Sequence, residues 1–281
     1  MEEIYRILIP TDYSETADYA LDMGITFAKR ANAEVHLFHN EDIPPDWVAI
    51  VEKDEGNMYD MVKDQLGLVK DQLSDRLTLG MDSGAKVESF LEYNKGYRAI
   101  LGHAENYETD LIVMGAHGHT GLKGLLMGSY TQKVLHHSIV PVFVTKFSDA
   151  PNDLRKVVFV SDFQPEHSES LLNAIAFAQH MRSEIEVLFI NTPSNFKDTD
   201  DIHNRIDQYI EKAPKGIIEK IGVVNAYHFE SGLAKYCEKN DIDIIAMPIY
   251  KKRHSWDVMG TTIEDVINNI DIPVLGLPVE N

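Results

Sequence analysis

The chain has 281 residues, enough for about two domains that each bury their own core, so a peptide hormone or a small disulfide-stapled protein is excluded. Hydrophobic residues make up 44% and charged residues 25% of the sequence, which is typical of a globular protein and excludes a largely disordered chain. The net charge of −19 opposes nonspecific attraction to nucleic acid or to an anionic membrane, so we expect neither as a partner.

A first strand is expected near residues 4–10. Its apolar end continues into Thr11 and Asp12, so that residues 7–12 form a short apolar run followed by an Asp. Residues 157–162 repeat this pattern, and later segments of the chain recur in the same order. The recurring segments are 110–114 at 243–247, 127–129 at 259–261, and 139–142 at 271–274. The sequence therefore predicts two copies of one unit, with domains at 1–149 and 150–281.

Within each copy, short apolar runs alternate with helical patterns, which indicates parallel strands joined by crossover helices. In the first copy we expect further strands near 34–39, 86–91, 111–115 and 141–145, and helices near 15–30, 57–80, 95–106 and 128–137. The predicted fold class is α/β, with two tandem, doubly wound, open parallel-sheet domains of Rossmann-like type. Ligands in such sheets bind beyond the carboxyl ends of the strands, where the strand order reverses. This rule points to the strand ends at Asp12 and Met114.

Residues 115–131 are the most informative stretch, because five glycines lie between a predicted buried strand and a predicted helix. The first turn of that helix offers unpaired N–H groups and the positive end of the helix dipole, and Ser129 and Thr131 add hydroxyl groups. Glycine lets a phosphate approach the main chain and tolerates a positive φ. We therefore predict an anion site here; the alternative is a glycine-rich loop that only turns the chain.

The chain contains neither the P-loop pattern G-x-x-x-x-G-K-[ST] nor the dinucleotide pattern G-x-G-x-x-G. No lysine or acidic pair is recognisable as dedicated to phosphoryl transfer. Binding of a phosphate is therefore favoured over its cleavage. Two alternatives stay open: a slow ATP hydrolase or nucleotidyl transferase on the same fold, and an interaction scaffold without nucleotide.

The motif Gly115-x2-Gly118-x9-Gly128-Ser129 resembles the nucleotide-binding signature of the universal stress protein family. Residues 9–17 are similar to that family's first strand and turn, and residues 140–144 to its last strand. The resemblance implies an ATP-binding α/β domain that dimerises through its last strand and serves survival under stress. Bound AMP or ADP is compatible with the same motif, and Mg²⁺ would accompany the phosphates.

By position, the resemblance implies that Asp12 lies near the ribose and the metal, and that Asn40 lies beside the adenine. The nucleotide-binding residues that it implies are Pro10, Thr11, Asp12, Asn40, Gly115, His117, Gly118, Gly128, Ser129, Tyr130 and Thr131. Asp12 has a structural alternative, since an Asp that ends a strand often caps the following turn. His117 is alternatively a solvated loop residue. No catalytic residue and no protein-held metal site is predicted.

The second copy departs from the motif, because Pro248 replaces the first glycine and Lys251 the second. Proline lacks the backbone N–H, and the lysine Cβ blocks close approach. We predict that this copy does not bind ATP as the first does. The basic residues 251–254 are then a solvated loop or a site for another anion.

The remaining predictions concern assembly and location. The strands of Val142 and Val274 are expected to pair the two copies inside one chain, with a homodimer as a further possibility. Cys237 is the only cysteine, which excludes an internal disulfide and fits a reducing compartment. The sequence begins without the pattern of a secretion signal and has no stretch of about 18 apolar residues, so we expect a cytoplasmic location.

Overall fold

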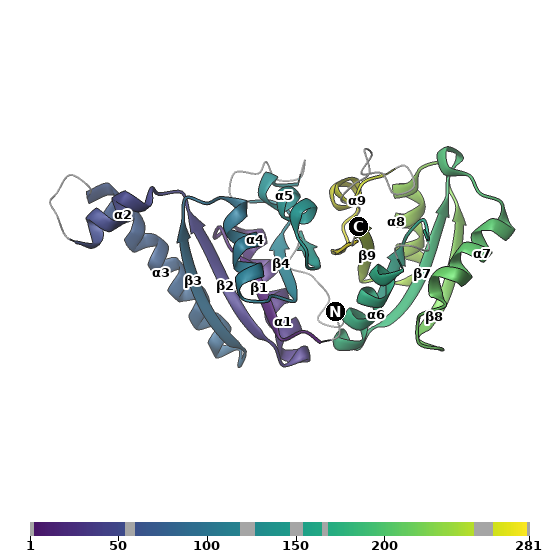
Figure 1. The fold of residues 1–281 in the computed structure, drawn as a ribbon, viewed down its shortest axis with the longest axis horizontal. Helices are drawn as coiled ribbons and strands as arrows, with labels where there is room; N and C mark the ends of the chain where they lie inside the picture. Colours follow the sequence, from purple (N-terminus) through teal and green to yellow (C-terminus); the bar gives the residue numbers. More distant parts are fainter. Residues whose placement is uncertain are drawn as a thin grey trace.

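The computed structural model describes residues 3–53, 60–118, 127–146, 154–164, 168–249 and 261–279. They form one ten-stranded sheet with helices on both faces (Figure 1). In the first half the strands are β1 (Arg6–Pro10), β2 (Glu34–Glu41), β3 (Lys86–Tyr93), β4 (Leu111–Gly115) and β5 (Val142–Thr145). In the second half they are β6 (Lys156–Val160), β7 (Glu184–Asn191), β8 (Ile218–Asn225), β9 (Ile244–Ile249) and β10 (Val274–Pro278).

Both halves have the same strand order, so the sheet reads β3-β2-β1-β4-β5-β10-β9-β6-β7-β8. All neighbours are parallel except β5 and β10, which pair antiparallel, with Phe143 opposite Leu275. These are the two strands that we expected to meet between the copies. The pairing makes the two halves one continuous sheet, and the halves lie side by side in Figure 1.

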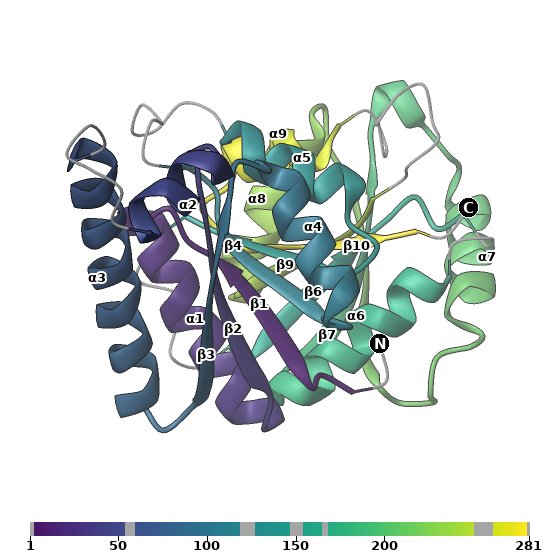
Figure 2. The same ribbon diagram turned by 60° about the vertical axis from the view of Figure 1, so that its left-hand side comes forward.

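The helices of the first half are α1 (Glu15–Ala31), α2 (Pro45–Glu52), α3 (Asp60–Asp82), α4 (Tyr97–Asn106) and α5 (Ser129–His137). Those of the second half are α6 (Glu169–Met181), a 3-10 turn (Pro193–Asn195), α7 (Thr199–Ile210), α8 (Phe229–Asn240) and α9 (Ile263–Asn269). Helices α1 and α3 cover one face of the first half and α4 the other, as Figure 2 shows.

The core continues from one half into the other. Helix α1 packs against α6, and the Arg30 guanidinium donates a hydrogen bond to the Met181 carbonyl at 2.8 Å. Between these helices and the sheet, the Phe27 ring makes edge contacts with Phe143 and Phe177, at centroid distances of 4.8 and 5.4 Å. All three rings are fully buried, so the halves share one hydrophobic core rather than a wet interface.

The predicted α/β fold class is confirmed, with interleaved strands and helices close to their expected bounds. Helix α1 begins after the capping residue Ser14, whose hydroxyl accepts a hydrogen bond from the Ala17 N–H at 3.3 Å. The sequence pattern did not predict α2, although a proline at its first turn marks its start. The domain limits at 149 and 150 stay a prediction, because residues 147–153 lie outside the described part of the chain.

The second half is shorter because its crossover from β7 to β8 contains only the 3-10 turn and α7, where the first half has α2 and α3.

Among the described residues, no helix is both long enough and apolar enough to cross a membrane.

Candidate functional site

A cavity of about 590 Å³ opens at the carboxyl ends of β1, β2 and β4. It lies where the strand order reverses, since β1 has β2 on one side and β4 on the other. All eleven residues singled out in the sequence line it: Pro10, Thr11, Asp12, Asn40, Gly115, His117, Gly118, Gly128, Ser129, Tyr130 and Thr131. The other described lining residues are Ala17, Phe38, His39, Ile100, Met114 and Met127.

The turn from β1 into α1 carries the one carboxylate of the described lining. Asp12 Oδ1 accepts a hydrogen bond from the Ser14 N–H at 3.1 Å, and the Thr11 hydroxyl accepts one from the Tyr13 N–H at 3.1 Å. Tyr13, which lies between Asp12 and Ser14 in the chain, has a φ of 64°. Asp12 therefore has the structural role that we considered as the alternative, and its carboxyl group also lines the cavity.

The glycines of the loop are required by close packing rather than by a positive φ. A Cβ at Gly115 would lie 2.8 Å from the backbone of Thr16, and a Cβ at Gly118 would lie 2.7 Å from Asp12 Oδ2. Positive φ among the described glycines occurs at Gly84, Gly96 and Gly216, so that part of our expectation is wrong for Gly115, Gly118 and Gly128. These contacts place the β4–α5 loop directly against the first turn of α1.

Helix α5 begins at the cavity with an uncapped amino terminus. Its N-cap residue is Gly128, no side chain caps it, and its first turn contains no acidic residue. The Gly128 N–H donates to the Ala116 carbonyl at 2.8 Å, which fixes the start of the helix beside β4. The first-turn amides that follow have no partner within the helix, so they concentrate positive potential at the cavity.

Two further predicted site residues, Thr131 and Asn40, also use their side chains within the protein. The buried Thr131 hydroxyl donates to the Gly115 carbonyl at 2.9 Å, which ties α5 to the end of β4. The Asn40 carboxamide accepts a hydrogen bond from the Lys95 N–H at 3.2 Å, in the turn after β3. Ser129 and Tyr130, by contrast, are exposed at the start of α5.

The sequence pattern missed His39, which lines the cavity. Its Nδ1 lies 2.7 Å from the Thr11 carbonyl and its Nε2 lies 2.8 Å from a Glu41 carboxylate oxygen. The imidazole stacks on the Tyr13 ring at 4.4 Å. The signal in the sequence was its position, since His39 is the last residue of the strand expected at 34–39, and β2 lies beside β1, which leads to Asp12.

The corresponding helix terminus of the second half is already occupied by acidic side chains. Thr262 and Asp265 form a reciprocal capping box at the start of α9, and the buried Thr261 hydroxyl donates to the Glu230 carboxylate. At the end of β6, Phe163 is fully buried in contact with the ring of Tyr209, 5.1 Å between centroids. Pro248 lies within β9, whereas Lys251 and the rest of 250–260 lie outside the described residues.

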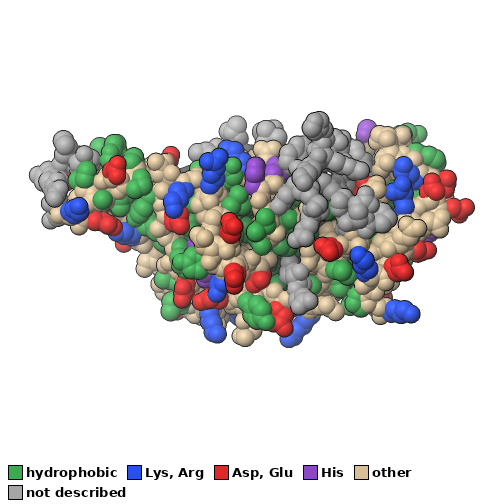
Figure 3. Space-filling model, in the orientation of Figure 1, with side chains coloured by type: hydrophobic (Ala, Val, Ile, Leu, Met, Phe, Trp, Pro, Cys, Tyr) green, Lys and Arg blue, Asp and Glu red, His purple; other side chains and the backbone are tan. Residues whose placement is uncertain are grey.

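The described lining contains no lysine or arginine, so an anion in this cavity would depend on backbone dipoles. On the face shown in Figure 3, Lys and Arg side chains of the described residues are interspersed with Asp and Glu side chains. Within the described lining, the feature that attracts an anion is therefore the start of α5.

Comparison with known proteins places the chain among relatives with this architecture. The model of the universal stress protein family matches residues 3–146. Universal stress protein MJ0577 of Methanocaldococcus jannaschii is 31% identical over 162 residues, which cover 50% of this chain and 94% of that protein. Universal stress protein MJ0531 of the same organism is 30% identical over 146 residues, covering 52% of this chain and 84% of that protein.

A solved structure extends the likeness over both halves. The crystal structure of a universal stress protein from Archaeoglobus fulgidus superposes with a TM-score of 0.74 at 20% identity, covering 97% of this chain and 98% of that one. Since the family model matches half of the sequence and the fold agrees over almost its whole length, the chain belongs to the universal stress protein family.

Proposed function

We propose that the first half of the chain binds an adenine nucleotide, with ATP as the expected ligand, and that the bound nucleotide is a regulatory ligand in the response to stress. The observation that carries the proposal is the uncapped amino terminus of α5, which opens into a cavity of about 590 Å³ lined by all eleven predicted residues. That volume is within the range of small-molecule and cofactor sites, about 300–1,000 Å³.

The lining of the cavity suits both the phosphates and the base of a nucleotide. The end at α5 offers first-turn amides and exposed hydroxyl groups for phosphates, while Phe38, Ile100 and Met114 give the cavity apolar surface for a base. Asp12 offers a hard carboxylate oxygen for Mg²⁺, which prefers one or two carboxylates together with phosphates and water. Because the described lining contains no lysine or arginine, binding is better supported than phosphoryl transfer.

A regulatory role requires that the nucleotide bind two states of the protein with different affinity. The cavity is connected to the second half, because α5 and the residue before its N-cap contact α9. We infer that the second half is the element whose arrangement responds to the nucleotide. The proposal includes a cytoplasmic location, where ATP is available and the buried Cys237 stays reduced.

The proposal is tested by removing one backbone donor with Ser129→Pro. Proline is accepted at the first helical position, and Gly128 before it is extended, with a φ of −63° and a ψ of 144°, which suits a residue before proline. Ser129→Ala is the matched control, since it removes the hydroxyl and keeps the N–H. We expect the Kd for ATP to rise about 10- to 100-fold in Ser129→Pro relative to Ser129→Ala, because a hydrogen bond to a charged group contributes about 1.5–3 kcal/mol.

Calorimetric titration of the full chain with ATP and Mg²⁺ measures both the affinity and the number of sites. We expect one nucleotide per chain, because Glu230 and Asp265 occupy the helix terminus that would be the second site. Equal affinities in the two Ser129 variants would exclude the backbone amide as donor. Two equivalent nucleotides per chain would exclude the asymmetry between the halves.

A further inference from the structure

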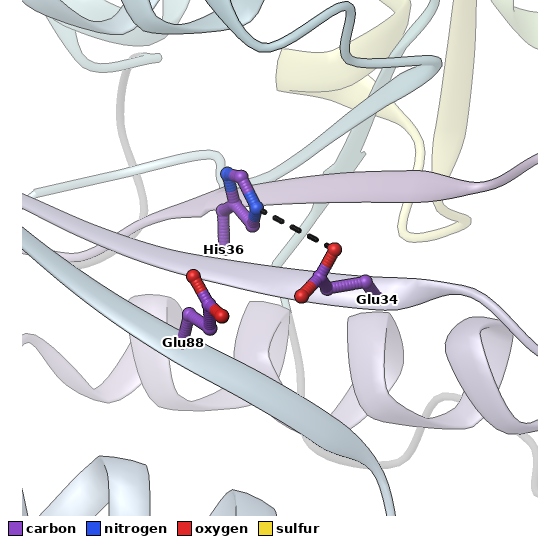
Figure 4. A group of neighbouring side chains, drawn as sticks. All are labelled: Glu34, His36 and Glu88. Carbon is purple, nitrogen blue, oxygen red and sulfur yellow. Dashed lines mark ion pairs between the residues drawn. The ribbon is translucent and has the colours of Figure 1, made fainter.

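Three side chains converge at the amino-terminal end of β2 and β3, at the edge of the sheet away from the cavity. Glu34 and His36 lie two residues apart on one face of β2, and Glu88 lies opposite His36 on β3. Figure 4 shows the imidazole and both carboxylates turned toward one another. Their ligand atoms all lie within 4.8 Å of one another. This group is separate from the nucleotide cavity and has no part in it.

The imidazole of His36 is held in place by its other nitrogen. Its side chain is 3% exposed, and its Nδ1 lies 2.8 Å from Nε2 of His103 on α4. Its Nε2 lies 4.0 Å from a Glu34 carboxylate oxygen, which is beyond hydrogen-bond distance. Among the described residues Nε2 therefore has no hydrogen-bond partner, although it is directed at two carboxylates.

The two ring nitrogens of His36 can have separate roles. A histidine can bind a metal through one ring nitrogen while the other makes a hydrogen bond. When Nδ1–H donates to His103, the Nε2 lone pair faces the carboxylates, and a cation between them would be favourable.

The second half provides an internal comparison at the same positions of its sheet. There Glu186 replaces His36 as the third residue of its strand, and Lys220 replaces Glu88 as its neighbour on the edge strand. The Lys220 ammonium lies 4.0 Å from the Glu186 carboxylate, which also accepts a hydrogen bond from Tyr236 at 2.6 Å. The protein thus supplies its own cation in the second half.

Arg6 does not fill this role in the first half. Its guanidinium lies 3.6 Å from a Glu34 oxygen and also donates to the Tyr107 carbonyl. It offsets the charge of one of the two carboxylates. The counterpart of Lys220 is the acidic Glu88, so the first half has room for a cation from solution where the second half has Lys220.

We propose that Glu34, His36 and Glu88 bind a divalent transition-metal cation of the zinc class. One imidazole nitrogen with two carboxylate oxygens is a ligand set that zinc accepts at about 2.0–2.2 Å. Ligand atoms that share one zinc ion lie closer together than 4.8 Å, so the two glutamate side chains have to move inward by roughly an ångström. Glu34 is half-buried and Glu88 is exposed, which allows this movement. His103 keeps the His36 ring oriented, as a hydrogen-bond partner of a ligating histidine commonly does.

The consequence for the fold is a link between β2 and β3. Strand β3 is the outer edge of the sheet, with most of its residues exposed or half-buried. A cation that joins His36 to Glu88 connects this edge strand to its neighbour by more than backbone hydrogen bonds. Three protein ligands leave a further coordination position open to water.

The test is calorimetric titration of the full, tag-free and chelator-treated chain with Zn²⁺ at pH 7, without nucleotide. We expect one zinc site per chain, and an affinity at least about 10-fold lower in Glu88→Gln, since even a partner of a ligand commonly changes metal affinity 10- to 100-fold. Glu88 is exposed, so this variant keeps the fold. The matched control is Glu184→Gln, which removes an exposed carboxylate at the start of β7 and should bind zinc like the unmodified chain.

The visible absorption of Co²⁺ is a second readout, because its bands depend on the ligand set. We expect these bands in the unmodified chain and in Glu184→Gln, and their loss in Glu88→Gln and in His36→Gln, with circular dichroism reporting the fold of each variant. No zinc site in the unmodified chain, or undiminished zinc binding by Glu88→Gln, would overturn the proposal.

Discussion

The Met127 N–H, which belongs to the lining of the cavity, donates a hydrogen bond to the Asn268 carboxamide oxygen at 2.8 Å. Asn268 belongs to α9 in the second half, so a residue from one half holds the backbone of the other beside the start of α5. The second half thereby contributes to the geometry of the cavity, although none of its described residues is in the lining.

We therefore expect Asn268→Ala to weaken ATP binding several-fold, because the freed Met127 segment loses its fixed position beside the phosphate end. A net hydrogen bond of this kind contributes about 0.5–1.5 kcal/mol. Calorimetric titration of the full chain measures the effect. Asn269→Ala is the control, since Asn269 lies next in the same helix and its carboxamide donates a hydrogen bond to the Asp265 carbonyl within that helix. Equal weakening in both variants would assign the effect to α9 stability instead.

Gly115→Ala should lower the free energy of unfolding by about 1–3 kcal/mol, the usual range for an added methyl group in a tightly packed position. The new Cβ would lie 2.8 Å from the Thr16 backbone, which cannot move without moving α1. Gly102→Ala is the contrasting variant, because nothing lies within 4 Å of its Cβ in α4, and it should gain about 0.5–1 kcal/mol. Urea unfolding measures both changes, and a stable Gly115→Ala would contradict the close packing of the loop on α1.

The pair His36 and His103 should make the protein less stable in mild acid. Burial, followed by nearby positive charge, lowers the pKa of each to about 4, from an ordinary value of 6.5. Between these values the unfolded chain binds more protons than the folded one, so stability is complete above pH 6.5 and falls as the pH decreases toward 4. His103→Phe, which suits the ring contacts with Phe38 and Phe90, should lose less stability between pH 7 and pH 5. Urea midpoints at the two pH values measure this, and parallel losses would argue against the pair as the cause.

Cys237 should be unreactive toward thiol reagents in the folded protein. Its side chain is buried, and burial, with a smaller contribution from the Glu186 charge, raises the pKa of the thiol to about 12. The reactive thiolate is therefore scarce at neutral pH. Mass spectrometry after alkylation should show labelling in urea and none under native conditions. Rapid native labelling would show that α8 opens readily.

The sheet and most helices could be predicted because their signals are local. Alternating apolar runs and helical spacing depend on the residues of one segment. Ligands of such sheets bind beyond the carboxyl ends of strands such as β1, so the expected strand ends also indicate the site. The eleven site residues converge on one cavity for that reason. Helix α2 was missed because its eight residues, with one buried side chain, carry too short a pattern.

The remaining features depend on contacts between distant segments. Nothing near Gly115 in the sequence indicates that Thr16 lies against it, so the glycine was attributed to the approach of a phosphate and to a positive φ. In the same way, we based the prediction for the second half on Pro248 and Lys251. One of the acidic side chains at the start of α9 is Glu230, which lies 31 residues before its hydrogen-bond partner Thr261 in the sequence. Such pairs become visible only when the chain is folded.

The antiparallel pairing of β5 with β10 also affects how the two halves can diverge. If two identical chains met along this strand, every substitution would appear on both sides of the contact, and their association would weaken on dilution. Covalent linkage fixes the ratio of the halves at one to one and keeps their local concentration high at any dilution. One half can then lose a ligand site without the other losing it. Since both strands are used internally, a second molecule would have to attach elsewhere, for instance along the outer strands β3 or β8.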